Sequence, residues 1–222
     1  MNTQELVLSQ LRWLGDEPDV GLTWGSRRDG VDFVNFICTH THTEATDTIV
    51  EIGPGYGRIT KALIRQHVPF GRYVGLELSP ARVKKLSRVF SVDRRCEFKQ
   101  ADILSLGELD IGDVALTFGA AVFEHLYPDF GKAIQAIWQF TKPGGILVFD
   151  VIRHDDAMLS TYSEFCTGNT TYFRIYSLTE VVQLLSDNGF ILRAVAPQSL
   201  GIGMHGDVSM EIKRATIACQ KV

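Results

Sequence analysis

From Thr46 to the C-terminus, short apolar runs alternate with stretches of helical periodicity, and this alternation constrains the fold more than any other feature. Strands are expected at 48–52, 73–78, 96–102, 113–119, 146–152, 190–195 and 209–220. Helices are expected at 58–67, 80–90, 130–141 and 177–188. Because helices that join parallel strands make right-handed crossovers, this order predicts a mostly parallel sheet covered by helices on both faces.

The last two expected strands have no helix between them, so they should pair as antiparallel neighbours at the sheet edge. The predicted fold class is therefore α/β: a doubly wound, seven-stranded, mostly parallel sheet with an antiparallel last strand. The segments 153–176 and 197–208 are predicted to be long irregular loops. Loops of this length are more often functional than incidental.

Residues 1–45 are predicted to form an N-terminal helical cap that belongs to the same domain as the core, residues 46–222. Two short helical pieces are expected in the cap, and the second covers 28–38. The first has an apolar face made of Leu6, Leu8, Leu11, Trp13 and Leu14. A chain of 222 residues is long enough for one sizeable core and short for two.

Charge and cysteine content exclude several classes of partner. A net charge of -4 and a pI near 5.9 argue against a basic face for nucleic acid. No apolar run approaches the ~18 residues of a membrane span, and no signal peptide is evident. The four cysteines form no C-x-x-C pair, so neither a metal site nor a disulfide framework is expected. These features predict a soluble cytoplasmic protein without nucleic-acid or membrane partners.

The stretch TIVEIGPGYGRIT, residues 48–60, places a glycine-rich loop directly after the first expected strand. Open α/β sheets bind ligands at the carboxyl ends of their strands, and glycines let a ligand approach the backbone closely. The loop has no Lys, which a phosphate-binding P-loop requires. Its spacing, Gly53-x-Gly55-x-Gly57, also differs from the dinucleotide fingerprint G-x-G-x-x-G.

Two carboxylates end the next two expected strands. Glu77, followed by Leu78, is placed to accept the hydroxyls of a ribose, at ~1.5–3 kcal/mol per charge-assisted bond. Asp102 is placed to accept the amino group of an adenine, and Ile103 to cover the ring. The alternatives are a solvated strand-edge residue for Glu77 and a turn or N-cap residue for Asp102.

These features together resemble the class I S-adenosylmethionine-dependent methyltransferases, from about Thr46 to the C-terminus. The motifs are E-x-G-x-G-x-G from Glu51 to Gly57, the two strand-end acids, and the K-P-G-G turn before the fifth strand. The resemblance implies S-adenosylmethionine as cofactor and S-adenosylhomocysteine as product. It also implies that the glycine loop faces the methionine part of the cofactor. The predicted cofactor-binding residues are Glu51, Gly53, Gly55, Gly57, Glu77, Leu78, Asp102, Ile103, Phe118 and Gly119.

A sulfonium cation favours aromatic faces, and Phe118, Phe123 and Trp24 are the candidates for such a face. Methyl transfer mainly requires alignment and exclusion of water. A base is required only when the acceptor atom carries a proton near pH 7. The candidate catalytic residues are His125, His154 and His205, all expected on the cofactor side. For His125 the alternative is that it caps and orients the following helix together with Glu124.

The predicted function is methyl transfer to an oxygen or nitrogen of a small-molecule acceptor. The segment after the fourth expected strand reads TFGA, not the D/N-P-P-Y pattern of enzymes that methylate nucleic-acid amino groups. The alternatives are a non-catalytic partner or regulatory subunit, a protein methyltransferase, and a nicotinamide-dependent oxidoreductase. The glycine spacing disfavours the last of these. The sequence leaves the choice between a monomer and a homodimer open.

Overall fold

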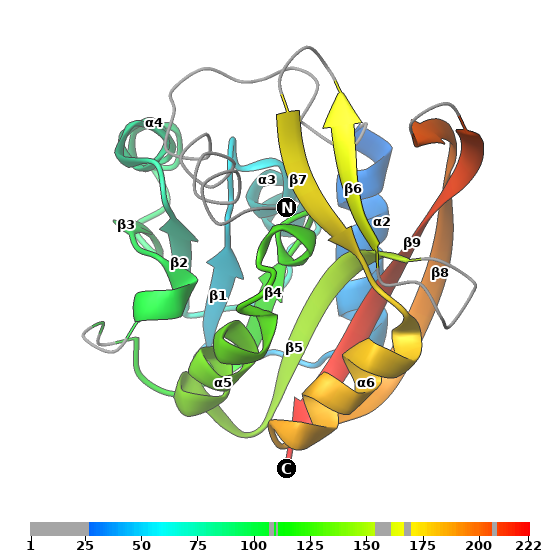
Figure 1. Ribbon diagram of the computed structural model, residues 1–222. Coiled ribbons are helices and arrows are strands. Elements are labelled where there is room, and N and C mark those ends of the chain that lie inside the picture. The colour runs from blue at the N-terminus through cyan, green and yellow to red at the C-terminus, as the bar shows by residue number, and fades with distance from the viewer. Residues whose placement is uncertain (1–26, 107–108, 110, 154–160, 167–169, 206–207) are drawn as a thin grey trace.

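Seven strands form one central sheet in the computed structural model, which describes residues 27–106, 109, 111–153, 161–166, 170–205 and 208–222 (Figure 1). Their order is β3-β2-β1-β4-β5-β9-β8. Five strands run parallel: β1 (Thr48–Ile52), β2 (Arg72–Glu77), β3 (Cys96–Gln100), β4 (Val114–Gly119) and β5 (Thr141–Arg153). β9 (Val208–Lys221) lies antiparallel between β5 and β8 (Phe190–His205). The predicted fold class is confirmed.

Helices cover both faces of this sheet. α2 (Arg27–His40), α3 (Arg58–Arg65) and α4 (Pro80–Val89) pack on one face, and α5 (Phe130–Phe140) and α6 (Leu178–Asp187) pack on the other. The central strands are therefore apolar on both sides, and every residue of β4 is buried. Each fully buried large apolar side chain in these two layers contributes about 1.5–3 kcal/mol.

The two long loops expected from the sequence are replaced by strands, so that prediction is wrong. β6 (Thr161–Cys166) and β7 (Thr170–Ile175) form a separate antiparallel pair, and β8 continues as far as His205. The sequences TYSEFC and TTYFRI are rich in Thr, Tyr and Phe, which favour strands. In β8, Pro197 is tolerated because β8 is the edge strand of the sheet. The pairing register of β8 with β9 shifts between Ser199 and Ile202, as at a β-bulge.

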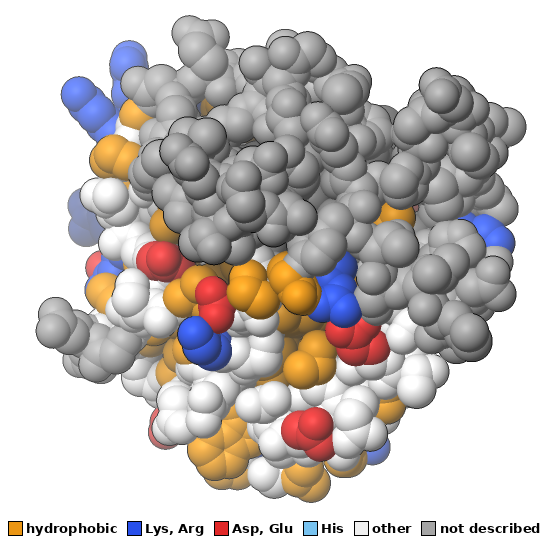
Figure 2. Space-filling model, viewed as in Figure 1, with side chains coloured by type: hydrophobic (Ala, Val, Ile, Leu, Met, Phe, Trp, Pro, Cys, Tyr) orange, Lys and Arg blue, Asp and Glu red, His pale blue; other side chains and the backbone are white. Residues whose placement is uncertain are grey.

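The second helical piece expected in the N-terminal cap is present as α2, which contacts α3. Gly30 of α2 lies against the side chain of Arg58 in α3, where an added Cβ would approach Cγ to 3.3 Å. The first expected piece, with Leu6 to Leu14, lies outside the described residues. In the described ranges, no helix combines the length and apolarity required to cross a membrane. Figure 2 shows charges of both signs interspersed with hydrophobic side chains on the described part of one face.

Candidate cofactor site

The glycine loop leaves the carboxyl end of β1 in a conformation that glycine favours. Gly53, Gly55 and Gly57 have φ values of 64°, 57° and 74°, in the left-handed region. The first glycine donates its N–H to the carbonyl of Leu76 in β2 at 2.8 Å. An added Cβ at Gly55 would have open space around it, with its nearest neighbour, the Gly53 carbonyl oxygen, at 4.0 Å. The backbone of Gly55 is therefore accessible to a ligand.

The carboxylate of Glu77 lies beside this loop because β2 neighbours β1 in the sheet. Its Oε2 accepts a hydrogen bond from the N–H of Gly55 at 3.0 Å. Its Oε1 accepts from the N–H of Ser79 at 3.1 Å and lies 3.6 Å from Nη1 of Arg82. The side chain is buried, not solvated at a strand edge. A carboxylate oxygen accepts about two hydrogen bonds, so Oε2 can accept a ligand hydroxyl in addition to Gly55. Leu78 follows, half-buried.

Glu51, the acid that precedes the loop, is buried at 2% exposure and bonds to α3 and β2. It accepts hydrogen bonds from Oγ1 of Thr60 at 2.8 Å and from the hydroxyl of Tyr73. Burial raises the pKa of Glu51 from 4.5 to about 7, against the lowering effect of the Tyr73 and Thr60 hydrogen bonds. Glu51 therefore ties together the strand, the helix and the neighbouring strand that carry the loop. Its direct contact with the cofactor stays a prediction.

Asp102 caps the short helix η1 (Ile103–Ser105), and its side chain accepts from the N–H of Leu104 at 2.9 Å. The N-cap alternative is thus the observed contact. The residue is exposed, while Ile103 is buried in the core. A contact between Asp102 and an adenine stays a prediction.

The end of β4 packs tightly on β1. An added Cβ at Gly119 would lie 3.0 Å from the carbonyl oxygen of Ile52. The rings of Phe118 and Phe123 are fully buried on opposite faces of the sheet. Neither presents an exposed aromatic face, and the third candidate, Trp24, lies outside the described residues. A cofactor contact of Phe118 or Gly119 stays a prediction.

Of the candidate catalytic histidines, the structure describes the side chain of His125 alone. His125 ends the short helix η2 (Phe123–His125) and is half-buried. His154 lies outside the described residues, and only the backbone of His205, at the end of β8, is placed. The structure therefore brings His125 near the carboxyl end of β4. Catalysis by any of the three stays a prediction.

A buried charge cluster next to η2 was not anticipated from the sequence. Arg214 of β9 pairs with Glu124 at 2.8 Å and with Asp150 of β5 at 2.7 Å. Arg214 and Glu124 are 90 positions apart in the chain, so no local pattern links them. The sequence offered one signal, Asp150, an acid inside the most hydrophobic expected strand, 146–152.

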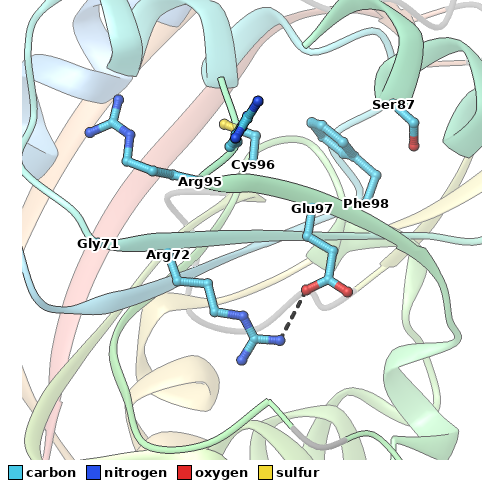
Figure 3. A pocket seen from close by; sticks show the side chains of 8 residues that line it. Gly71, Arg72, Ser87, Arg95, Cys96, Glu97 and Phe98 are labelled. Atoms are coloured by element: carbon cyan, nitrogen blue, oxygen red, sulfur yellow. Dashed lines mark hydrogen bonds and ion pairs between the residues drawn. The ribbon is translucent and has the colours of Figure 1, made fainter. Parts of the chain in front are cut away.

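A cavity of about 630 Å³ is lined by residues that do not belong to the glycine loop; Figure 3 shows its lining side chains. Its lining includes Arg72 at the start of β2 and Cys96 at the start of β3. Arg94 and Arg95, which lie between α4 and β3, also line it. Arg72 pairs there with Glu97 at 3.0 Å. Because the strands are parallel, this cavity is at the amino edge of the sheet, opposite the loop. Within the described ranges, no group of three or more His, Cys, Asp or Glu side chains is arranged to hold a metal ion.

Comparison with known proteins supports the resemblance to methyltransferases. Residues 50–149 match the family described as "Methyltransferase domain". The chain is 31% identical over 132 residues to trans-aconitate 2-methyltransferase from Deinococcus radiodurans. That match covers 56% of this chain and 48% of the relative, so the chain spans about half the length of this curated relative.

Solved structures share the fold at low sequence identity. 1,6-Didemethyltoxoflavin-N1-methyltransferase from Burkholderia thailandensis, solved with S-adenosylhomocysteine, has a TM-score of 0.68 and 15% identity over 100% of this chain and 91% of that chain. An S-adenosylmethionine-dependent methyltransferase from Clostridium acetobutylicum has a TM-score of 0.65 and 12% identity, over 89% and 93%. The [4+2]-cyclase SpnF has a TM-score of 0.66 and 15% identity, over 86% and 80%. The fold alone therefore does not define one reaction.

Three observations indicate the same fold: the sheet order, the glycine loop with its two strand-end acids, and the sequence match over 50–149. Residues 50–149 thus match the methyltransferase domain family, and the chain has the fold of solved S-adenosylmethionine-dependent methyltransferases.

Proposed function

We propose that this protein binds S-adenosylmethionine at the carboxyl edge of β1, β2 and β4 and transfers the methyl group to an oxygen or nitrogen of a small-molecule acceptor. The observation that carries the proposal is the carboxylate of Glu77, which is buried and held beside the accessible backbone of Gly55. This arrangement offers a hydrogen-bond acceptor and a surface without side chains at the same place.

The residues present suit this cofactor. Its hydroxyl and amino groups donate hydrogen bonds, and the strand-end acids Glu77 and Asp102 accept them. The cofactor has no phosphate, which agrees with a loop sequence, GPGYG, that contains no Lys. When bound, the cofactor supplies a methyl group attached to a positively charged sulfur. After the transfer this sulfur is part of a neutral thioether, the leaving group. The chain itself then has to orient the two reactants and exclude water.

The names of the relatives support a small acceptor. One is named for trans-aconitate, and a structural neighbour for the N1 position of didemethyltoxoflavin. His125 would act as a base where the acceptor atom carries a proton near neutral pH, since it lies just beyond β4. An acceptor that is already deprotonated, such as a carboxylate, would not need it.

The first test is calorimetric titration of the protein with S-adenosylhomocysteine, with NADH titrated in parallel. The proposal expects binding of S-adenosylhomocysteine alone. Glu77→Ala should weaken that binding by ~3 kcal/mol, about a hundredfold, because bonds to a carboxylate are lost. Glu97→Ala is the matched control, since Glu97 is a strand carboxylate that pairs with Arg72 at the other end of the sheet. Unchanged affinity in Glu77→Ala would refute the ribose assignment.

Turnover then separates an enzyme from a binding protein. Methyl transfer from labelled S-adenosylmethionine would be screened against trans-aconitate, other small carboxylic acids, nitrogen heterocycles and a protein extract. Label in small molecules supports the proposal. Label in protein alone would make the chain a protein methyltransferase. Tight cofactor binding without any transfer would favour a regulatory subunit.

A further inference from the structure

The segment that follows β4 is held by a buried cluster of one guanidinium and two carboxylates. Nη2 of Arg214 lies 2.8 Å from Oε1 of Glu124, and Nη1 lies 2.7 Å from Oδ2 of Asp150. The exposed fractions of these residues are 4%, 1% and 6%. The planar guanidinium thus joins two strands, β5 and β9, to the short helix η2.

Asp150 also fixes the backbone of the turn directly. Its Oδ1 accepts the N–H of Ala121 at 2.6 Å. Ala121 has φ of 58°, in a region that residues with a Cβ rarely adopt. Such a conformation persists when the surrounding contacts determine it. The Asp150 carboxylate is one of those contacts.

The turn held in this way forms part of the wall of the glycine loop. The side chain of Val122 is so close to Gly53 that an added Cβ there would lie 2.6 Å from its Cγ2. On the opposite face, Phe123 packs against Phe130 and Phe149, with ring centroids 5.6 Å and 4.7 Å away. Contacts on both sides therefore set the distance between the turn and the glycine loop.

A cluster of this composition is difficult to explain as a source of stability alone. Burying charges has a large desolvation cost, and well-packed apolar residues often stabilise a fold equally well. In addition, Oε2 of Glu124 is buried and has no hydrogen-bond donor among the described residues. The ion pairs and hydrogen bonds of the cluster hold the turn in one orientation, and methyl transfer requires its reactants to be aligned.

We infer that Arg214 and Asp150 are positioning residues for methyl transfer: with Glu124, they fix residues 120–124 against the glycine loop before the cofactor binds. The inference rests on the proposed function. Neither residue is required to touch the cofactor or the acceptor. Their effect is that the binding surface needs little rearrangement when the cofactor arrives.

The first experiment compares two substitutions at one position whose side chains have the same number of heavy atoms. Asp150→Asn keeps an oxygen that accepts from the N–H of Ala121 and loses only the acceptor for Nη1 of Arg214, whereas Asp150→Leu loses both acceptors. We expect S-adenosylhomocysteine affinity within about threefold of wild type for the Asn variant and at least about tenfold weaker for the Leu variant. Hydrogen exchange of the unliganded protein should be faster over residues 118–126 in the Leu variant only.

Asp47→Leu is the matched control. Asp47 pairs with Lys142 at 2.6 Å and accepts the N–H of Glu44 at 2.8 Å, so it also holds one cation and one amide. It lies at the amino edge of the sheet, just before β1, and its substitution should leave S-adenosylhomocysteine affinity unchanged. Wild-type affinity and exchange in Asp150→Leu would overturn the inference.

A triple variant, Glu124→Leu/Asp150→Leu/Arg214→Met, separates positioning from stability, and it serves if the single Leu variant does not fold. Removing all three charges should restore the wild-type urea midpoint. The affinity of the triple variant for S-adenosylhomocysteine should stay at least about tenfold weaker than that of wild type. If the triple variant recovers both, the cluster is only structural and the inference fails. If wild type itself does not bind S-adenosylhomocysteine, the proposed function fails, while the exchange measurement still decides whether the cluster holds the turn.

Discussion

Replacing Glu51 by Gln should stabilise the protein at alkaline pH relative to acidic pH. The Glu51 carboxyl is buried, and its pKa rises from 4.5 to about 7 in the folded state. Between these values the folded protein retains a proton that the unfolded chain has released. The free energy of unfolding of the wild type therefore falls as pH rises from about 4.5 to about 7, and this contribution is constant above that range.

The size of the effect follows from the two pKa values. A gap between 4.5 and about 7 corresponds to about 3 kcal/mol at ~1.36 kcal/mol per pKa unit. The Gln side chain keeps an oxygen that accepts from Thr60 and Tyr73, but it has no proton to lose. The difference in unfolding free energy between Glu51→Gln and wild type should therefore grow in favour of the variant by up to about 3 kcal/mol from pH 5 to pH 8.

The assay is urea unfolding of the ligand-free protein at pH 5, 6, 7 and 8, followed by circular dichroism. The difference between variant and wild type cancels the other titrating groups. Glu44→Gln, the same substitution at an exposed position before β1, is the control. If the curves of Glu51→Gln and wild type run parallel from pH 5 to pH 8, the reasoning about the buried carboxyl is refuted.

Two further predictions concern the loop and the core. Gly57→Ala should lower both stability and S-adenosylhomocysteine affinity, because φ is 74° and the new Cβ would lie 2.6 Å from a phenylalanine ring. Gly112→Ala, with φ of 73° and nothing within 4 Å, should cost only the conformational part, about 1–2 kcal/mol, so equal urea midpoints for the two variants would contradict the steric argument. Ile134→Ala, at a fully buried position of α5, should lower the unfolding free energy by about 2–5 kcal/mol without a change in m-value, and a loss below ~1 kcal/mol would show that the core layer under α5 is not closely packed.

Local signals were sufficient for most of the sheet and for the elements that carry the candidate site. Strand and helix periodicity predicted β1 to β4 and α3 to α6 to within a few residues, because each element carries its own apolar pattern. β5 instead begins at Thr141 and includes the K-P-G-G segment that was predicted to be a turn before residue 146. The stretch 153–176 was predicted to be a loop because its two short segments rich in Thr and aromatic residues show no clear alternation of apolar and polar positions. Their pairing as β6 and β7 depends on each other's backbone, not on either segment alone.

The directions of individual side chains were predicted less well than the elements that carry them. The sequence places Phe118 and Glu51 near strand ends and Phe123 just beyond one, next to the expected ligand. In the structure both rings are in the core, and the carboxylate bonds to α3 and β2. A strand alternates its faces, so whether a residue near the end points to the ligand or to a helix layer depends on what packs against it.

The sequence by itself therefore determined the fold class, the glycine loop and the acids Glu77 and Asp102 at successive strand ends. These depend on periodicity and on spacing along the chain, which need no knowledge of distant residues. The tertiary structure decided that Arg214 meets Glu124 and Asp150, that Asp150 holds Ala121, and that Glu51 is buried. The contacts of Arg214 join segments up to 90 positions apart, and they form because β9 inserts antiparallel beside β5, an arrangement that strand pairing establishes only in the folded sheet. Glu51 is buried because α3 and β2 pack against the end of β1.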